Sequence, residues 1–259
     1  MSNMVPKVIH YCWFGRNPLP EEYKEYIRSW KKYCPDYKIV EWNEDNFDVT
    51  ENPYCREAYQ AGKWAFVSDY ARLKIIYENG GVYFDTDVEL LRDITPLISD
   101  GFGFIGFQNP IEATTGLGFA AAPYNVCVKT MLDMYESRHF EISKGKYDLL
   151  PCPVVNTVAL VGCGMRIGRK HACAIQRLDG MNVYPICYFN PMNSDTRKCK
   201  ITDKTYTIHH YSATWIADSS KKLRRIKALF PSILLDIRTE YIAKRDVLEY
   251  IKKRNEGNI

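Results

Sequence analysis

The chain has 259 residues, of which 46% are hydrophobic and 25% are charged, and its formal net charge is +4. This composition is typical of a globular protein and excludes intrinsically disordered and fibrous classes. The nine cysteines are scattered and form no C-x-x-C pair, which predicts reduced thiols. The sequence shows no export signal and no long uninterrupted apolar span, so we expect a cytoplasmic protein.

The first third of the sequence predicts alternating strands and helices. The run Lys7–Trp13 is β-branched and aromatic and predicts a buried strand, residues 21–33 have helical spacing of large side chains, and Lys38–Trp42 predicts a second strand. Strand, helix and strand within about 35 residues indicate a βαβ unit with parallel pairing. Residues 54–78 are again helical, with a break near Gly62.

The middle of the sequence continues the α/β alternation. Residues 103–107 and 116–122 predict short strands, and residues 125–140 and 154–161 predict helices. Residues 182–215 are polar, rich in turns and strand-like. No internal repeat or low-complexity linker divides this part of the chain.

Two carboxylates directly follow an apolar run in the sequence Val82-Tyr-Phe-Asp85-Thr-Asp87. Ligands bind at the carboxyl ends of strands in open α/β sheets, and paired carboxylates supply hard oxygen ligands to a divalent cation. A D-x-D triplet also occurs in solvated turns, and Asp69 and Arg72, three residues apart on the preceding helix, also fit a plain ion pair. The order of these motifs along the chain therefore carries the argument.

Three motifs follow one another: Trp13 in an aromatic first strand, W-A-F-x-S-D-x-x-R over residues 64–72, and N-G-G-x-Y-x-D-x-D over residues 79–87. This order resembles glycosyltransferase family thirty-two, the D-x-D sugar transferases that include fungal Golgi mannosyltransferases and bacterial capsule and O-antigen transferases. It is more distantly similar to the glucosyltransferase domain of the large clostridial toxins. The likeness is dense over residues 5–95 and returns at residues 207–215.

The resemblance implies a GT-A fold, in which a Rossmann-like mixed sheet is flanked by helices, and a nucleotide-sugar donor with Mn²⁺ or Mg²⁺. It implies that Trp13 stacks on the nucleobase and that Tyr83 supports the nucleotide. Asp69 and Arg72 would hold sugar hydroxyls and phosphate. Asp85 would contact ribose and metal, and Asp87 would ligate the metal.

A second element of the implied site lies near the end of the matched region. Related enzymes carry H-x-x-[GS] followed by a tryptophan, which here selects His209 as the metal ligand, with Ser212 nearby and Trp215 as a lid over the diphosphate. His210 is the alternate ligand, because neighbours on a strand point to opposite faces and only one histidine can face the site. Trp215 packed in the core is the alternative to the lid.

The expected function is retaining, metal-dependent transfer of galactose or glucose from a UDP-sugar to a polyprenyl-diphosphate-linked saccharide in capsule or O-antigen assembly. No carboxylate stands out as a nucleophile, so a same-face mechanism is expected, with the metal and Arg72 stabilising the departing phosphate. Candidate acceptor residues are Gln108, Asn109 and residues 114–116, and more weakly residues 156–157. A GDP-mannose-dependent mannosyltransferase and a toxin-like protein glycosyltransferase are the alternatives.

The charge is unevenly distributed along the chain. Residues 221–259 carry eleven lysines and arginines against five acids, a balance of +6, which leaves −2 for the expected catalytic domain of residues 1–220. The domain is therefore not expected to bind nucleic acid. The tail predicts a basic amphipathic helical segment, which either packs on the domain with a solvated basic face or lies on the inner leaflet of an anionic membrane.

Overall fold

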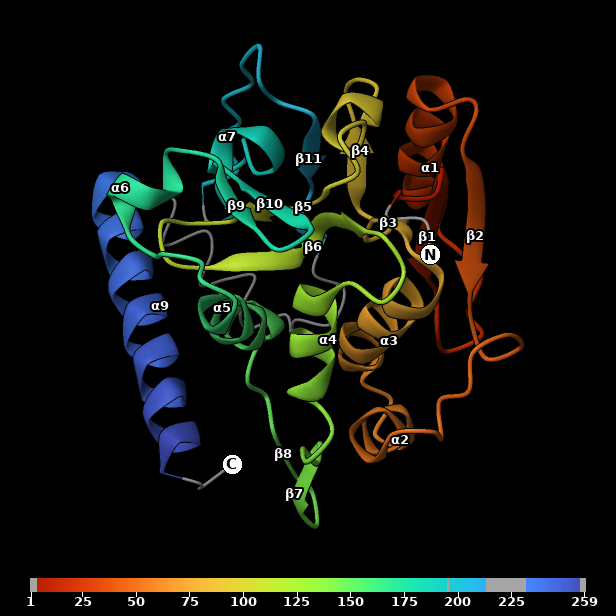
Figure 1. Cartoon of the computed structure of the whole chain (residues 1–259). Helices are drawn as coiled ribbons and strands as arrows, with labels where there is room; N and C mark the ends of the chain where they lie inside the picture. Colours follow the sequence, from red (N-terminus) through yellow and green to blue (C-terminus); the bar gives the residue numbers. More distant parts are fainter. Residues whose placement is uncertain (1–3, 195, 213–231, 257–259) are drawn as a thin grey trace.

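A seven-stranded mixed sheet forms the centre of the molecule (Figure 1). The computed structural model describes residues 4–194, 196–212 and 232–256. In the order in which they pair, the strands are β2 (Lys38–Trp42), β1 (Val8–Cys12), β3 (Gly81–Tyr83), β6 (Ala113–Ala121), β5 (Gly103–Phe107), β10 (Met181–Tyr184) and β9 (Gln176–Leu178). Strand β1 runs parallel to β2 and β3, whereas β6 runs antiparallel to β3 and β5.

Helices cover both faces of this sheet (Figure 1). The helices are α1 (Glu21–Tyr33), α2 (Pro53–Gln60), α3 (Trp64–Asn79), the 3₁₀ turn η1 (Thr95–Leu97), α4 (Val126–Asp133), α5 (Cys152–Gly162), α6 (Arg169–Ala172), α7 (Ile186–Phe189) and α9 (Ser232–Asn255). Successive strand residues alternate between two cores: Phe104 packs on the α1 side and Ile105 on the side of α3, α4 and α5. Strands β3 and β5 contain no charged residue and are buried on both faces, whereas the edge strands β2 and β9 carry charged residues and are partly exposed.

Two small sheets stand beside the central one. In one of them β4 (Val88–Leu90) pairs antiparallel with β11 (Thr207–His209), and in the other β7 (Glu141–Ser143) pairs with β8 (Lys146–Tyr147). The whole arrangement confirms the expected α/β class, with a mixed sheet flanked by helices. The expected βαβ unit is also confirmed, because β1 and β2 are parallel and α1 connects them.

Two expectations for the elements were wrong in part. The helix expected over residues 125–140 ends at Asp133, because the chain then turns to bury Tyr135 and Phe140 around Tyr54. Residues 182–215, expected to be strand-like, contain most of β10 and all of β11, but they also contain α7, which begins after Pro185. This short helix places Phe189 in the core, where its ring stacks on Phe104 at 5.0 Å.

Glycines set the turn that leads from α3 into β3. Gly80 and Gly81 both have positive φ, at 64° and 100°, which a residue with a side chain rarely adopts. A Cβ atom on Gly80 would lie 2.6 Å from Pro123, and one on Gly81 would lie 2.9 Å from His10. The pair therefore lets the chain reverse closely and enter β3 in the register that carries Asp85 to the end of the strand.

The described part of the basic tail packs on the domain. Helix α9 lies against α5, and its residues Ala243, Val247 and Tyr250 are buried in the same core as α3, α4 and α5 (Figure 1). Among the described residues, no helix is both long and apolar enough to cross a membrane.

Candidate active site

The D-x-D triplet forms a turn between two strands. Strand β3 ends at Tyr83, and the turn closes where the Val88 N–H donates to the Asp85 carbonyl at 3.0 Å. Strand β4 follows and pairs with β11, in which His209 lies opposite Val88. The antiparallel pairing thus brings His209 to the two aspartates, although it is far from them in the sequence.

The side chains of Asp85, Asp87 and His209 form a compact group. Each offers one ligand atom, and these atoms lie within 4.8 Å of one another. His209 Nε2 is 3.1 Å from Asp87 Oδ1, and His209 Nδ1 is buried without a hydrogen-bond partner among the described residues. Two carboxylates and an imidazole with an unsatisfied nitrogen suit a divalent cation such as Mn²⁺ or Mg²⁺. The residues present therefore fit the expected metal.

A strained turn at Tyr211 and Ser212 follows His209 and contacts Asp87. Tyr211 adopts a left-handed conformation with φ of 46°, and its hydroxyl donates to Asn190 Oδ1 at 2.8 Å. The turn directs the Ser212 N–H onto Asp87 Oδ2 at 2.9 Å. A positive φ in a residue other than glycine costs free energy and persists only where surrounding contacts enforce it, which is common at functional sites.

The two neighbouring histidines lie in different surroundings. His210 Nε2 is 2.9 Å from Glu89 Oε2, and its ring stacks on Tyr26 with the centroids 4.4 Å apart. His209 instead faces Asp87. The geometry therefore places His209, and not His210, beside Asp85 and Asp87; we call these three residues the metal-ligating group because they could hold a divalent cation.

Arg72 lies behind the aspartates and is only 4% exposed. Its Nη2 is 3.0 Å from Asp69 Oδ1 and 3.2 Å from Asp85 Oδ1, and its Nε donates to the Ser68 carbonyl at 3.0 Å. The remaining amino group contacts Asp85 and Thr115 at 3.4 and 3.5 Å. Through these contacts the guanidinium holds the two aspartates in place.

Tyr83, like Arg72, contacts the Asp85 carboxylate and fixes its position. Its side chain is fully buried, its hydroxyl donates to Asp85 Oδ1 at 3.0 Å, and the Arg72 guanidinium lies 5.1 Å from its ring centroid. The structure therefore places the expected nucleotide-supporting residue beneath the carboxylate, where it fixes the orientation of Asp85.

The carboxylates of this site differ in acidity. Burial raises the pKa of Asp85, with Arg72 opposing the rise and the like charge of Asp87 adding to it. Burial also acts to raise the pKa of Asp87, but the charge and hydrogen bond of His209 and the Ser212 N–H lower it to about 2. Asp69, Asp85 and Asp87 outnumber the cationic groups beside them, so a bound cation would relieve their repulsion.

Strand β6 and the start of α5 form a further wall beside Arg72. Thr115 donates from its N–H and its hydroxyl to Asn156 Oδ1, at 3.3 and 3.2 Å. Asn156 is fully buried, and its Nδ2 has no hydrogen-bond partner among the described residues. Cys152, which the sequence did not single out, lies between Thr114, at 3.8 Å from its hydroxyl, and the Asp69 carboxylate. No sequence signal distinguishes this cysteine from the other eight.

Two other candidate acceptor residues are engaged elsewhere. Gln108 and Asn109 donate from their side chains to Glu112 Oε2 at 2.8 and 2.6 Å, within the turn between β5 and β6. The structure therefore uses both amides to tie this turn. Trp215 lies outside the described residues.

Trp13 lies just beyond the end of β1. Its Nε1 donates to the Asn17 carbonyl at 2.6 Å, and its ring meets Tyr23 edge to face at 5.6 Å. Beside it is a hollow of about 240 Å³, lined by Trp13, Arg16, Asn17, Glu41, Asn43, Glu44 and Asp45. The indole thus borders an open space of polar character that can admit a planar ring.

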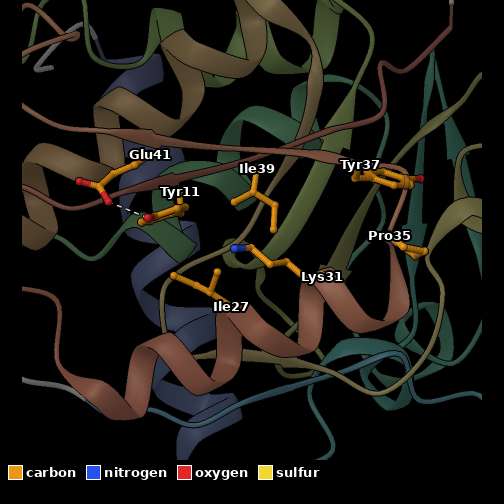
Figure 2. A pocket seen from close by; sticks show the side chains of 7 residues that line it. All are labelled: Tyr11, Ile27, Lys31, Pro35, Tyr37, Ile39 and Glu41. Carbon is orange, nitrogen blue, oxygen red and sulfur yellow. Dashed lines mark hydrogen bonds between the residues drawn. The ribbon is translucent and has the colours of Figure 1, made fainter.

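A larger hollow of about 510 Å³ lies between α1 and the edge of the sheet. Figure 2 shows its lining residues, Tyr11, Ile27, Lys31, Pro35, Tyr37, Ile39 and Glu41, with the Tyr11 hydroxyl donating to Glu41 at 2.6 Å. None of the metal-ligating group lines it. We therefore assign the chemistry to the carboxylate group and not to the larger hollow.

Comparisons with known proteins agree with this geometry. Residues 20–102 match the family described as "Glycosyltransferase sugar-binding region containing DXD motif". Inositol phosphoceramide mannosyltransferase 3 of Schizosaccharomyces pombe is 32% identical over 101 residues, which are 38% of this chain and 28% of the relative. Mannosyl phosphorylinositol ceramide synthase SUR1 of Saccharomyces cerevisiae is 29% identical over 100 residues, 37% of this chain and 26% of the relative.

Among solved structures, PaToxG Glycosyltransferase aligns with a TM-score of 0.49 and 21% identity, over 61% of this chain and 69% of that structure. The chain spans about a quarter of the length of the two fungal relatives. Residues 20–102 thus resemble the sugar-binding region of glycosyltransferases, and the mixed sheet flanked by helices fits the expected GT-A type α/β fold. The matched region contains Asp69, Arg72 and the D-x-D triplet.

Proposed function

We propose that this protein is a retaining, metal-dependent glycosyltransferase that moves a hexose from a nucleotide sugar to a lipid-borne acceptor. The observation that carries the proposal is the convergence of Asp85, Asp87 and His209 next to the pair of Asp69 and Arg72. This is the donor set for a divalent cation, beside a carboxylate that suits sugar hydroxyls.

The named relatives favour mannose as the sugar. Both fungal proteins carry a mannosyl transfer in their names, which supports GDP-mannose over the UDP-galactose or UDP-glucose expected from the bacterial members. Their names also contain a ceramide lipid, which supports a lipid-borne acceptor. A UDP-hexose donor in capsule or O-antigen assembly is the second candidate and depends on the resemblance to the bacterial transferases alone.

In this proposal each residue has a separate task. Asp85, Asp87 and His209 hold Mn²⁺ or Mg²⁺, which when bound supplies Lewis-acid stabilisation of the leaving diphosphate. Trp13 stacks on the nucleobase in the hollow beside it. The Asp69 carboxylate accepts hydrogen bonds from sugar hydroxyls. Asn156 Nδ2, next to Thr115 in the wall formed by β6 and α5, is a further buried donor without a hydrogen-bond partner among the described residues.

Arg72 has a positioning and electrostatic role. Its guanidinium fixes Asp69 and Asp85 and keeps a positive charge next to the group that binds the diphosphate. Because no residue is assigned as a nucleophile, transfer takes place on one face of the sugar, and the departing phosphate accepts the proton of the acceptor hydroxyl. A glycosyl adduct trapped on any Asp or Glu would refute this step.

The test is donor hydrolysis and transfer measured with GDP-mannose, UDP-galactose and UDP-glucose, each with and without Mn²⁺. We expect metal-dependent turnover with one donor, and loss of that turnover in Asp87→Asn. Asp203→Asn is the matched control, since Asp203 is an exposed aspartate outside the metal-ligating group. Turnover in Asp87→Asn equal to that of the control would remove Asp87 from the metal site, and turnover with no donor would overturn the proposed function.

A further inference from the structure

Helix α9 presents a mixed apolar and basic stripe to solvent. The stripe consists of Ile237, Arg238, Tyr241, Lys244, Arg245, Leu248 and Lys252, all exposed. Its three apolar members are unusually accessible, with exposed fractions of 50% for Ile237, 70% for Tyr241 and 50% for Leu248. Spacings of four, seven and eleven residues place them on one side of a helix with 3.6 residues per turn.

The buried side of the helix is separate from the stripe. Ala243, Val247 and Tyr250 point into the domain core and account for the attachment of α9 to α5. The exposed apolar residues therefore do not stabilise the fold, and hydrophobic burial favours covering them with another surface.

Charges on α9 are segregated in the same direction. The stripe holds four cationic residues and no acid, although the helix as a whole carries six cations and four acids. Two of the acids face the rest of the protein: Glu240 pairs with Arg169 at 2.8 Å, and Asp236 accepts from Asn193 at 2.9 Å. Of the four cations in the stripe, Arg245 pairs with Asp246 at 2.8 Å and Lys252 with Glu256 at 3.8 Å. Arg238 and Lys244 make no ion pair with the described residues, so their charges are available for a ligand outside the chain.

We propose that this stripe binds the surface of an anionic lipid bilayer, with Ile237, Tyr241 and Leu248 entering the headgroup region and the cations contacting lipid phosphates. On such a surface the apolar side chains of the stripe would contact the boundary between headgroups and acyl chains, and the flanking lysines and arginines would contact the anionic headgroups. A protein partner of neutral or basic surface would not match this charge. The binding does not depend on the proposed transfer reaction, although it would bring the domain to a lipid-borne acceptor.

The experiment is flotation of the full chain with phosphatidylcholine vesicles, with and without phosphatidylglycerol. We expect flotation with the anionic vesicles only, and weaker binding as the salt rises from about 0.1 M to about 1 M, where screening shortens the reach of charges. Arg238→Gln with Lys244→Gln should weaken partitioning by about fivefold for each cation removed. Tyr241→Ser with Leu248→Ser should weaken it by about tenfold or more, because binding scales with buried apolar area.

A matched control replaces Ile142 and Leu149 by Ser, since both are exposed apolar residues elsewhere on the surface. This control should float as the unchanged protein does. The proposal would be overturned if the folded, unchanged protein did not float with anionic vesicles. It would also be overturned if both stripe variants floated as well as the unchanged protein, or if the control lost as much flotation as the stripe variants. A dimer in solution that the stripe variant abolishes would assign the stripe to self-association instead. The transfer assay is independent of these outcomes when the acceptor is water-soluble.

Discussion

Gly116 offers a probe of the active site that changes only one atom. A Cβ atom at this position would lie 2.9 Å from Asp85 Oδ2 and 3.4 Å from Arg72 Nη1. The backbone of Gly116 does not have a positive φ, so alanine fits its conformation without strain. Gly116→Ala therefore acts on the side chains of the site and leaves the path of the chain unchanged.

The size of the effect follows from this contact. Ordinary carbon contacts lie near 3.5 Å, so the Asp85 carboxylate must shift by roughly 0.5 Å from its position in the site. Because a misplacement of about 1 Å costs a catalytic site about 100-fold in rate, we expect kcat/KM to fall by about tenfold, with a higher Mn²⁺ concentration needed for half-maximal rate.

The assay is donor turnover over a series of Mn²⁺ concentrations, together with urea unfolding to monitor stability. Gly162→Ala is the matched control, because a Cβ atom there meets no atom within 4 Å. Wild-type kcat/KM and metal dependence in Gly116→Ala would refute the placement of Asp85 at the metal. An equal loss in Gly162→Ala would show that the effect is not specific to the site.

Three further predictions concern other buried or functional groups. Burial lowers the pKa of His10 to about 4, below the usual 6.5, so its contribution to stability, roughly 3 kcal/mol, is complete above pH 6.5 and lost as the pH falls toward 4. Urea unfolding at pH 6.5 and at pH 4 should show a smaller fall in the free energy of unfolding for His10→Gln than for the unchanged protein. Equal falls in the two proteins would contradict this prediction. Arg72→Met should lower the free energy of unfolding by about 3–5 kcal/mol, because it leaves Asp69 and Asp85 buried without their cation, and an unchanged urea midpoint would contradict this. Trp13→Ala should raise the KM for the donor about tenfold through loss of base stacking, and an unchanged KM in steady-state kinetics would place the nucleobase elsewhere.

Local patterns predicted most of the elements that carry the site. The residues of α1 and β2 follow from hydrophobic spacing and from Pro35, and the pairing of β1 with β2 follows from the rule that joins a strand, a helix and a parallel strand. The end of α3 follows from Gly80 and Gly81. These features depend on neighbours in sequence, which is why the sequence alone was sufficient to predict them.

Other features depend on contacts between distant segments. Motif spacing selected His209 and left His210 as the alternate, but only the pairing of β11 with β4 directs His209 toward Asp87. The resemblance implied that Asp69 and Arg72 hold sugar hydroxyls and phosphate, and only the structure shows that the Arg72 guanidinium also contacts both Asp69 and Asp85. Residue spacing cannot show which donors of a guanidinium are already engaged.

The sequence by itself determined the α/β alternation and the order of the motifs along the chain, because periodicity, turn residues and charge are local properties. Only the tertiary structure decided which polar groups meet. Cys152 joined the wall beside Asp69 because α5 packs against β6, and the basic tail acquired an inner and an outer face because Val247 and Tyr250 are buried in the domain core. Such contacts arise from burial of apolar surface between segments far apart in the chain, and no local pattern specifies them.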